Sequence, residues 1–356
     1  SGRELMRNTE FLTFPPEQED SSAHLAVIDE QKVLDIIGEE NIDKWVNIIQ
    51  KKADLKSYLL QRKKNLTFSD IAKRDLAVYA EDFANSQSLK EQMHDGRGKR
   101  YIPGSSLKGA IRTAIVAQQA LENKELASKN LKDFKKRFSG QELEKRLFGE
   151  NPNKDVFRFL QVGDIYFDFK TIALKAEIFN MHGNKWKFKP GGSQLIEAIP
   201  DGAKGSFQLK INHALLRKNN PKTDIDFLSE KKMFQYINEH TKRLLENEIE
   251  FWNERESYDP EILDGYLDWL NEIMQIATDC TEKEAVLRVG AGSGWAFITG
   301  DWIKDPEITN EREYENFLFA VRRNQKKYDD NVPFPKSRKI GDQADIFGFV
   351  KLKMEE

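Results

Sequence analysis

The sequence predicts an α+β protein, and three observations carry that prediction. Apolar residues recur at three- and four-residue intervals over residues 24–95 and 226–280, which indicates amphipathic helices. Residues 156–169 are rich in Val, Phe, Ile and Tyr, which favours β-strands. A helix start with small residues and cations lies between these blocks, at residues 101–115. Helical blocks separated by a run of strands are typical of mixed folds.

The N-terminal half is expected to contain a helical block and then a well-marked helix. Residues 24–95 are predicted to be mostly helical, including the stretch from Ile71 to Phe83. Pro103-Gly104 then breaks the chain, and Ser105 or Ser106 can cap a helix that continues to about Asn123. Further helix is expected over residues 129–147.

Strands are expected next, at residues 156–169, 171–181 and 195–211. Residues 183–192 and Pro200-Asp-Gly202 are predicted to form connecting turns. A helix followed by three or more strands is compatible with a ferredoxin-like sheet.

The C-terminal half is predicted to return to helices before two short strands. Two helices are expected between residues 226 and 280, and a strand at 285–289 then leads into a glycine-rich loop. Residues 295–298 have a strand-like composition, residues 314–324 are expected to form a helix, and residues 346–354 a closing strand.

Composition limits the class of protein. A chain of 356 residues can bury a large core in one or two domains, and its formal net charge of −3 lacks the strong positive charge of a uniformly nucleic-acid-binding chain. A single cysteine, Cys280, excludes an internal disulfide and favours a reducing compartment. No secretory signal or membrane-spanning run is present in the sequence, so a cytoplasmic protein is expected. The five histidines have no metal-ligand spacing, so no metal site is predicted.

Positive charge is concentrated in three segments. Residues 96–115 carry five cations and no acid, and further basic clusters lie at 129–146 and 322–339. Local basic tracks on a mixed surface suit a protein that binds a polyanion on one side. The cluster at 129–146, taken alone, is better explained as a solvated helix face.

The helix start at residue 104 has the features of a phosphate site. Ser105, Lys108 and Arg112 share one helix face beside unpaired backbone N–H groups, which suits a phosphate. Gly104 and Gly109 would let another backbone approach closely. A P-loop is excluded, because the motif lacks the Gly-Lys-Ser/Thr ending.

The glycine-rich loop Val289-Gly-Ala-Gly-Ser-Gly-Trp295 allows three interpretations. It could hold S-adenosylmethionine as in class I methyltransferases, bind a dinucleotide, or lie against phosphates of RNA. The first two need a helix after the loop, whereas residues 295–298 look like a strand, so the third is favoured. Trp295 could stack on a base or pack in the core, and both remain open. Lys336 and Arg338 could contact phosphates or form a solvated basic loop.

Several of these segments resemble one known family. Residues 102–115, IPGSSLKGAIRTAI, resemble the signature of the RAMP superfamily, the RNA-binding subunits of CRISPR effector complexes. Phe159-Leu-Gln-Val-Gly-Asp-Ile165 resembles the strand that follows this signature, and residues 289–295 resemble the glycine-rich loop of the superfamily. Pro335-Lys-Ser-Arg338 and Phe347-Gly-Phe-Val-Lys-Leu352 resemble the C-terminal end of the type III-A (Csm) member at the 3′ end of the crRNA.

The resemblance implies a fold. It implies a ferredoxin-like, RRM-like RAMP fold with large helical insertions, with a second RRM-like half as an open alternative. Residues 1–213 would form an RRM-like domain with the insertion at about 24–95. Residues 214–356 would form a helical segment and the second half, which carries the glycine-rich loop. Members of this kind usually open with a strand, so either Ser1-Gly2 is a cloning remnant or a first strand is missing ahead of it, and the missing strand is the expectation.

It also implies a function without catalysis. The chain would bind crRNA, cap the 3′ end of a type III-A complex, and dock on the neighbouring backbone RAMP subunit. It would support crRNA maturation by host nucleases in antiviral defence, with no cofactor. A CRISPR RNA endonuclease and a class I methyltransferase are the alternatives. The predicted RNA-binding residues are Arg100, Gly104, Ser105, Ser106, Lys108, Gly109, Arg112, Gly290, Gly292, Ser293, Gly294, Trp295, Lys336 and Arg338.

Overall fold

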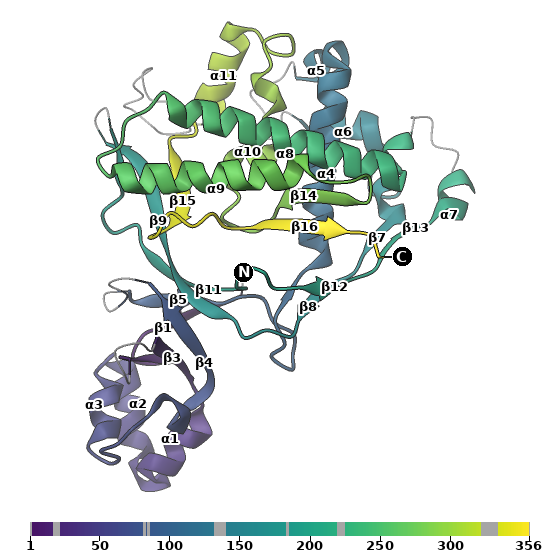
Figure 1. Cartoon of the computed structure of the whole chain (residues 1–356). Helices are drawn as coiled ribbons and strands as arrows, with labels where there is room; N and C mark the ends of the chain where they lie inside the picture. The colour runs from purple at the N-terminus through teal and green to yellow at the C-terminus, as the bar shows by residue number, and fades with distance from the viewer. Residues whose placement is uncertain are drawn as a thin grey trace.

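The computed structural model describes residues 2–16, 22–80, 83, 86–131, 140–182, 185–218, 225–321 and 334–355. Within these ranges the chain folds as a mixture of helices and sheets, so the predicted α+β class is confirmed. Figure 1 shows the small helices α1–α3 at one end of the molecule and the long helices α8 and α9 at the other. None of the described helices is both long and apolar enough to cross a membrane.

One large sheet organises the molecule around strand β9. Its main path runs β1 (Glu4–Met6), β5 (Ser88–Lys90), β11 (Gln194–Ala198), β9 (Ile172–His182), β4 (Ala72–Tyr79), β3 (Ala23–Ile28) and β2 (Phe11–Phe14). Two further strands, β10 (Lys185–Phe188) and β15 (Ser337–Gly341), also pair with β9. With 11 residues, β9 is long enough to pair with four different strands.

Three short helices cover one face of this sheet at its β2–β4 side: α1 (Glu30–Ile37), α2 (Ile42–Gln50) and α3 (Leu55–Leu60). Asp29 and Asp54 cap α1 and α3 by accepting hydrogen bonds from backbone N–H groups of the first turn. Val33, Ile37 and Leu59 pack from these helices onto Leu12 and Ala26 of the strands.

The prediction of a mostly helical block at 24–95 is therefore only partly right. The three helices are present, but residues 71–83 contain β4 rather than helix. The reason is long-range pairing: β4 is antiparallel to β3 and parallel to β9, so both of its edges are hydrogen-bonded. Strands β3 and β5 also lie in the block predicted to be mostly helical. Strands β1 and β2 in residues 2–16 were not predicted, and residues 183–192, predicted as a turn, contain β10.

The middle of the chain surrounds the predicted signature helix. That helix, α4 (Gly104–Glu122), is confirmed, and α5 (Lys124–Asn130) and α6 (Gln141–Phe148) follow it, whereas residues 132–139 of the predicted helix lie outside the described residues. Short strands surround the beginning of α4: β6 (Tyr101–Ile102), β7 (Leu160–Val162), β8 (Ile165–Phe167), β12 (Gly205–Ser206) and β13 (Leu209–Ile211).

The C-terminal half forms a helical layer over a two-stranded sheet. After α7 (His213–Lys218), the predicted helices appear as α8 (Glu230–Asn253) and α9 (Pro260–Thr278), which pack together. The antiparallel strands β14 (Glu284–Arg288) and β16 (Phe349–Lys353) confirm the predicted strands. Helix α11 (Glu311–Val321) confirms the helix predicted from 314, whose last residues lie outside the described ranges, as do Arg322, Arg323, Lys326 and Lys327 of the third basic cluster.

The hydrophobic cores cross the predicted domain boundary at residue 213. The largest core joins Ile111 and Ala114 of α4 to Met233 of α8 and Leu287 of β14. A second core joins Phe179 of β9 to several aromatic and aliphatic side chains of the C-terminal half, including Trp252, Tyr266 and Ile340. The division at 213 and the ferredoxin-like detail therefore stay predictions, while the observed cores are continuous between the two parts.

Gly104→Ala should unfold or strongly destabilise the chain. An added Cβ at Gly104 would lie 2.2 Å from the carbonyl oxygen of Val162, which is a backbone atom and cannot shift cheaply. We expect a loss of about 3 kcal/mol or more in the free energy of unfolding, measured in urea. Gly109→Ala in the same helix is the matched control, because nothing lies within 4 Å of the added atom. That control should gain up to about 1 kcal/mol, since alanine favours helix; equal effects of the two changes would contradict the packing argument.

Candidate RNA-binding surface

The N-terminus of α4 is occupied by a carboxylate of the chain itself. The backbone N–H of Gly104 donates a hydrogen bond of 2.8 Å to Oδ1 of Asp164, in the turn between β7 and β8. Pro103 is the N-cap residue and no side chain caps the helix in the way predicted for Ser105 or Ser106, so that prediction is wrong. Asp164 thus supplies the negative charge that the sequence analysis assigned to a phosphate. Ser105 and Ser106 remain exposed.

The two predicted cations of α4 are held by internal partners. Lys108 Nζ donates to the carbonyl oxygen of Leu160 at 2.6 Å, and burial lowers the pKa of its ammonium. Arg112 forms ion pairs of 2.9 Å with both Glu144 and Asp155. These partners come from later segments that fold back onto the helix, so the two cations hold α4 against them.

Arg100 is buried in a second charge network. Its side chain is 8% exposed, and its Nε lies 2.7 Å from Oε1 of Glu197 on β11. Glu197 also pairs with Arg74 at 2.9 Å and accepts a hydrogen bond from Thr171. Burial acts to raise the pKa of Glu197, but the hydrogen bond and charge of Arg100 and the charge of Arg74 outweigh burial and lower it. Arg100 therefore links the segment before α4 to the large sheet.

The glycine-rich loop follows β14 and leads into a short helix, α10 (Gly294–Thr299). The predicted strand at 295–298 is therefore wrong. Gly290 and Gly294 have φ angles of 91° and 77°, which favour glycine, and both are exposed. Ser293 is buried, and its hydroxyl donates to the carbonyl oxygen of Gly290 at 2.7 Å. The Ser293 side chain thus fixes the conformation of the loop through a hydrogen bond within the loop itself.

The sheet that carries the glycine-rich loop does not favour a methyltransferase site. Such loops follow a strand of a parallel sheet. In the described part of the chain, β14 pairs only with β16, and the pairing is antiparallel.

Trp295 lies in an aromatic cluster beside the loop. Its ring is 4.9 Å from that of Phe334 and 5.9 Å from that of Phe317, and Lys304 Nζ lies 5.6 Å from its centre. The residue is half-buried. Of the two roles left open by the sequence, core packing accounts for these contacts.

The glycine-rich loop and the C-terminal basic segment meet at one small cavity. Gly292, Ser293 and Gly294 line it from one side, and Arg338 and Lys339 of β15 from another. Its volume is about 60 Å³, which is room for roughly two water molecules. No residue of α4 lines it, and the described residues hold no cluster suited to a metal ion. This cavity is too small for a nucleotide.

Arg338 closes the cavity through a buried ion pair with Glu248 of α8. Its Nη2 lies 2.9 Å from Oε2 of Glu248, whose side chain is 16% exposed, and Trp252 and Tyr266 also donate to that carboxylate. Burial acts to raise the pKa of Glu248, but the charge and hydrogen bonds of Arg338 hold it at about 2. Arg338 therefore holds β15 against α8, while Lys336, two residues earlier, is exposed.

The structure does bring α4 and the helix after the glycine-rich loop together. Thr113 Oγ1 lies 3.5 Å from the carbonyl oxygen of Ile298, and an added Cβ at Gly300 would lie 2.9 Å from the Cβ of Ala117. The contact is at the middle of α4, two turns after Ser105. Ser105, Gly109 and Thr113 are spaced by four residues, so they form one helix stripe that ends at α10.

Comparison with known proteins identifies the class to which this fold and surface belong. The model of the RAMP superfamily matches residues 84–297 of the 356, from the segment before α4 through the glycine-rich loop. The chain belongs to the RAMP superfamily, which confirms the resemblance found in the sequence.

Two kinds of relative refine this membership. The chain is similar to the CRISPR system Cms protein Csm5 of Methanocaldococcus jannaschii, with 27% identity over 224 residues. That alignment covers 58% of this chain and spans about half, 51%, of the relative. The fold matches a chain of a Csm–crRNA–target RNA ternary complex with a TM-score of 0.73 and 18% identity, over 99% of this chain and 96% of that one. It also matches crystalline T. onnurineus Csm5, with a TM-score of 0.64 and 19% identity, over 85% of this chain and 90% of that one.

Breaking the Glu248–Arg338 pair should be costly. Glu248→Gln leaves the arginine buried without a counter-charge, and we expect a loss of about 3–5 kcal/mol in the free energy of unfolding. Glu250→Gln, exposed on the same helix, is the control and should change stability by less than about 0.5 kcal/mol. A Glu248→Gln protein as stable as the control would show that the pair does not hold β15 in place.

The same pair should give a pH dependence with a defined sign. The pKa of Glu248 falls on folding from its ordinary 4.5 to about 2, so its stabilisation is present above pH 4.5 and is lost as the pH falls toward 2. Urea unfolding of the parent between pH 5 and pH 3 should therefore show a steeper loss of stability than that of Glu248→Gln. Parallel curves for the two proteins would contradict this assignment.

Proposed function

We propose that this chain is a crRNA-binding subunit that caps the 3′ end of the crRNA in a type III-A CRISPR effector complex and does not itself catalyse a reaction. The observation that carries the proposal is the 27% identity with Csm5, found in a chain that belongs to the RAMP superfamily. The fold likeness to a chain of the Csm–crRNA–target RNA complex, over 99% of this chain, is consistent with it.

In this proposal RNA lies along the exposed small residues rather than on the paired cations. Ser105, Ser106 and Gly109 of α4 would face the sugar–phosphate chain, together with Gly290 and Gly294 of the glycine-rich loop. Lys336 would add an exposed positive charge. Backbone contacts of this kind do not depend on base sequence, which suits a subunit that serves many spacers.

The remaining predicted site residues would act by holding that surface in shape. Arg100, Lys108, Arg112 and Arg338 each have carboxylate or carbonyl partners within the chain. Gly104 sits against the backbone of Val162, and Gly292 against Phe347. Ser293 and Trp295 are turned into the loop and its aromatic cluster. Their replacement would reduce RNA binding through loss of structure.

The proposed partners follow from the same role. The chain would dock on the neighbouring backbone RAMP subunit of the complex and support trimming of the crRNA by host nucleases, in the cytoplasm. Co-purification tests this directly: the tagged chain, expressed in cells with the other subunits and a CRISPR array, should be recovered with crRNA and RAMP partners. Recovery of the chain free of both would refute the proposal.

Gly109→Glu should weaken binding of single-stranded RNA by about tenfold. The position is exposed, and nothing lies within 4 Å of an added Cβ, so the new side chain can extend into solvent and its carboxylate repels the phosphates. Gly109→Gln has the same size without the charge and is the matched control. Fluorescence anisotropy with a labelled single-stranded RNA measures both. Equal affinities for the two variants would place the RNA elsewhere.

Lys336→Ala should lower the salt dependence of the same binding. A lost phosphate contact reduces the slope of log K against log salt by roughly 0.7 for single strands. Lys44→Ala, on α2 at the other end of the molecule, serves as the control and should leave the slope unchanged. An unaltered slope for Lys336→Ala would remove this residue from the surface.

A further inference from the structure

The small sheet of β6, β8 and β12 has two different faces. Ile102 of β6 and Ile165 of β8 pack on the core that contains α4. Because successive side chains of a strand point to opposite faces, Tyr101 and Tyr166 lie on the other face. Ser206 of β12 is paired with Tyr166 and shares this face. The sheet thus packs aliphatic side chains on the core and presents two aromatic rings on its outer face.

The two tyrosines form one stacked pair. Tyr101 and Tyr166 are direct partners across the strands, with ring centroids 5.4 Å apart and an angle of 28° between the ring planes. Because the rings are nearly parallel, Tyr101 covers one face of the Tyr166 ring. On the other side the neighbouring strand carries only the small, exposed Ser206. Tyr166 is accordingly 37% exposed, and one face of its ring is open.

Cations surround the open ring. Lys99, two residues before Tyr101, has its Nζ 5.6 Å from the centre of the Tyr166 ring and 3.1 Å from Asp168. Asp168 is 93% exposed, so this ion pair holds Lys99 only weakly. Arg97, in the turn before β6, and Lys204, just before β12, are both exposed.

The tyrosine pair adjoins the start of α4. Asp164, which accepts the backbone N–H of Gly104, is two residues before Tyr166, and Tyr101 is three residues before Gly104. The two exposed serines of the proposed RNA surface directly follow Gly104. RNA on those serines would therefore pass beside the tyrosines, so the inference below rests on the proposed function.

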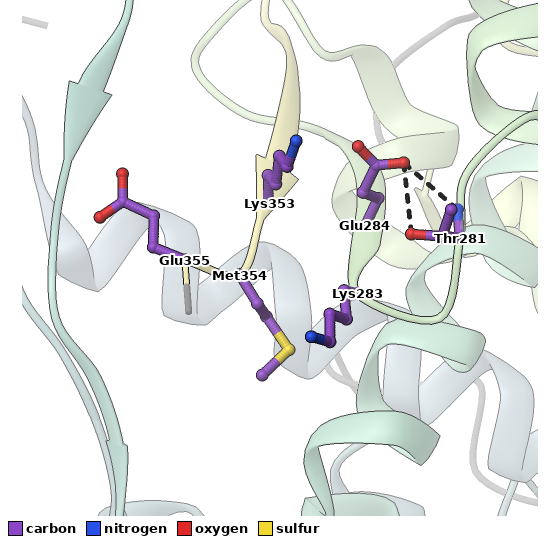
Figure 2. Close-up of a pocket in the computed structure, with 6 residues that line it drawn as sticks. All are labelled: Thr281, Lys283, Glu284, Lys353, Met354 and Glu355. Atoms are coloured by element: carbon purple, nitrogen blue, oxygen red, sulfur yellow. Dashed lines mark hydrogen bonds between the residues drawn. The ribbon is translucent and has the colours of Figure 1, made fainter.

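A larger hollow elsewhere offers no comparable contact. It has a volume of about 460 Å³ and lies at the end of the β14–β16 sheet. Figure 2 shows the six residues that line it, which include two lysines and two glutamates but no aromatic side chain. Such a lining has no ring on which a base could stack, so size alone does not select a site for RNA.

We propose that the outer face of the β6–β8–β12 sheet stacks an unpaired base of single-stranded RNA on Tyr166, on the side of Ser206. Aromatic side chains on the exposed face of a sheet bind unpaired bases in this way. Tyr101 supports the ring from the other side, so the ring is held in place before RNA binds. Every base has a flat face, so the contact tolerates any sequence.

Removal of the ring tests the proposal. Tyr166→Ala should weaken binding of a labelled single-stranded RNA by about tenfold, because one stacking contact is lost. Tyr166→Phe keeps the ring and should restore the affinity of the parent. Tyr258→Ala is the matched control: this tyrosine is 58% exposed and has Lys187 Nζ 5.6 Å from its ring centre, but it lies between α8 and α9. The control should bind as the parent does.

Two further measurements separate stacking from attraction of charges. The slope of log K against log salt should be the same for Tyr166→Ala and the parent, because stacking releases no counterions. An RNA of the same length without bases is the second probe. The parent should prefer the intact RNA to this probe, and Tyr166→Ala should reduce that preference by about tenfold. If Tyr166→Ala does not fold, crosslinking of the parent to a 4-thiouridine RNA decides, and the crosslink should map to residues 165–167.

Three outcomes would overturn the proposal. Tyr166→Ala could bind RNA as the parent does while Gly109→Glu does not, which would leave the proposed function standing without this contact. Tyr166→Ala could bind RNA normally but fail to recover the partner subunits in co-purification, which would assign the face to protein. A parent chain that binds no single-stranded RNA would refute the proposed function, and this inference with it.

Discussion

The structure depends on β9, because this one strand pairs with segments from both ends of the chain. Strand β4 from the N-terminal part, β11 from the middle and β15 from the C-terminal part all pair with it. Its side chains enter two cores, with Ala173 on the side of the N-terminal strands and Phe179 under α8 and α9. Through β15 the strand also carries Arg338 to Glu248, which brings the C-terminal segment to the glycine-rich loop. A change in the register of β9 would move all of these at once.

The charged side chains at and near the start of α4 are paired with groups of the chain itself, so they stabilise the fold. Asp164 lies at the N-terminus of α4, and Lys108 and Arg112 bond to Leu160, Glu144 and Asp155. Each of these partners lies 32 to 60 residues later in the chain, so the helix start is a point where distant segments are joined. In the proposed function, RNA would contact the stripe of small, exposed residues on α4. Such a surface fits the regular shape of a sugar–phosphate chain better than a particular base.

The sequence could predict the elements whose pattern is local. The helix at Gly104–Glu122, the strand at Glu284–Arg288 and the strand at Phe349–Lys353 each carry their own period and breakers. Strand β4 was read as helix because its evidence is its two neighbours, which lie far away in the sequence. The same limit applied to the site: cations were found by type, but whether Arg100 faces RNA or Glu197 depends on a contact 97 residues away. Helix α10 was missed because its ends are set by the positive φ angles of Gly294 and Gly300, not by apolar spacing.

A subunit that ends an assembly needs surfaces that do not repeat. A patch that could bind an identical patch, or its own complement on the next copy, would let the complex grow. The β14–β16 sheet prevents such pairing at the outer edge of β14. Asn238 and Thr241 of α8 hydrogen-bond to the outward backbone groups of Glu284 and Val286. A further strand would find these groups already paired, so it could not add to this edge. In the proposed role at the crRNA 3′ end, α8 would thus limit growth of the assembly at this sheet.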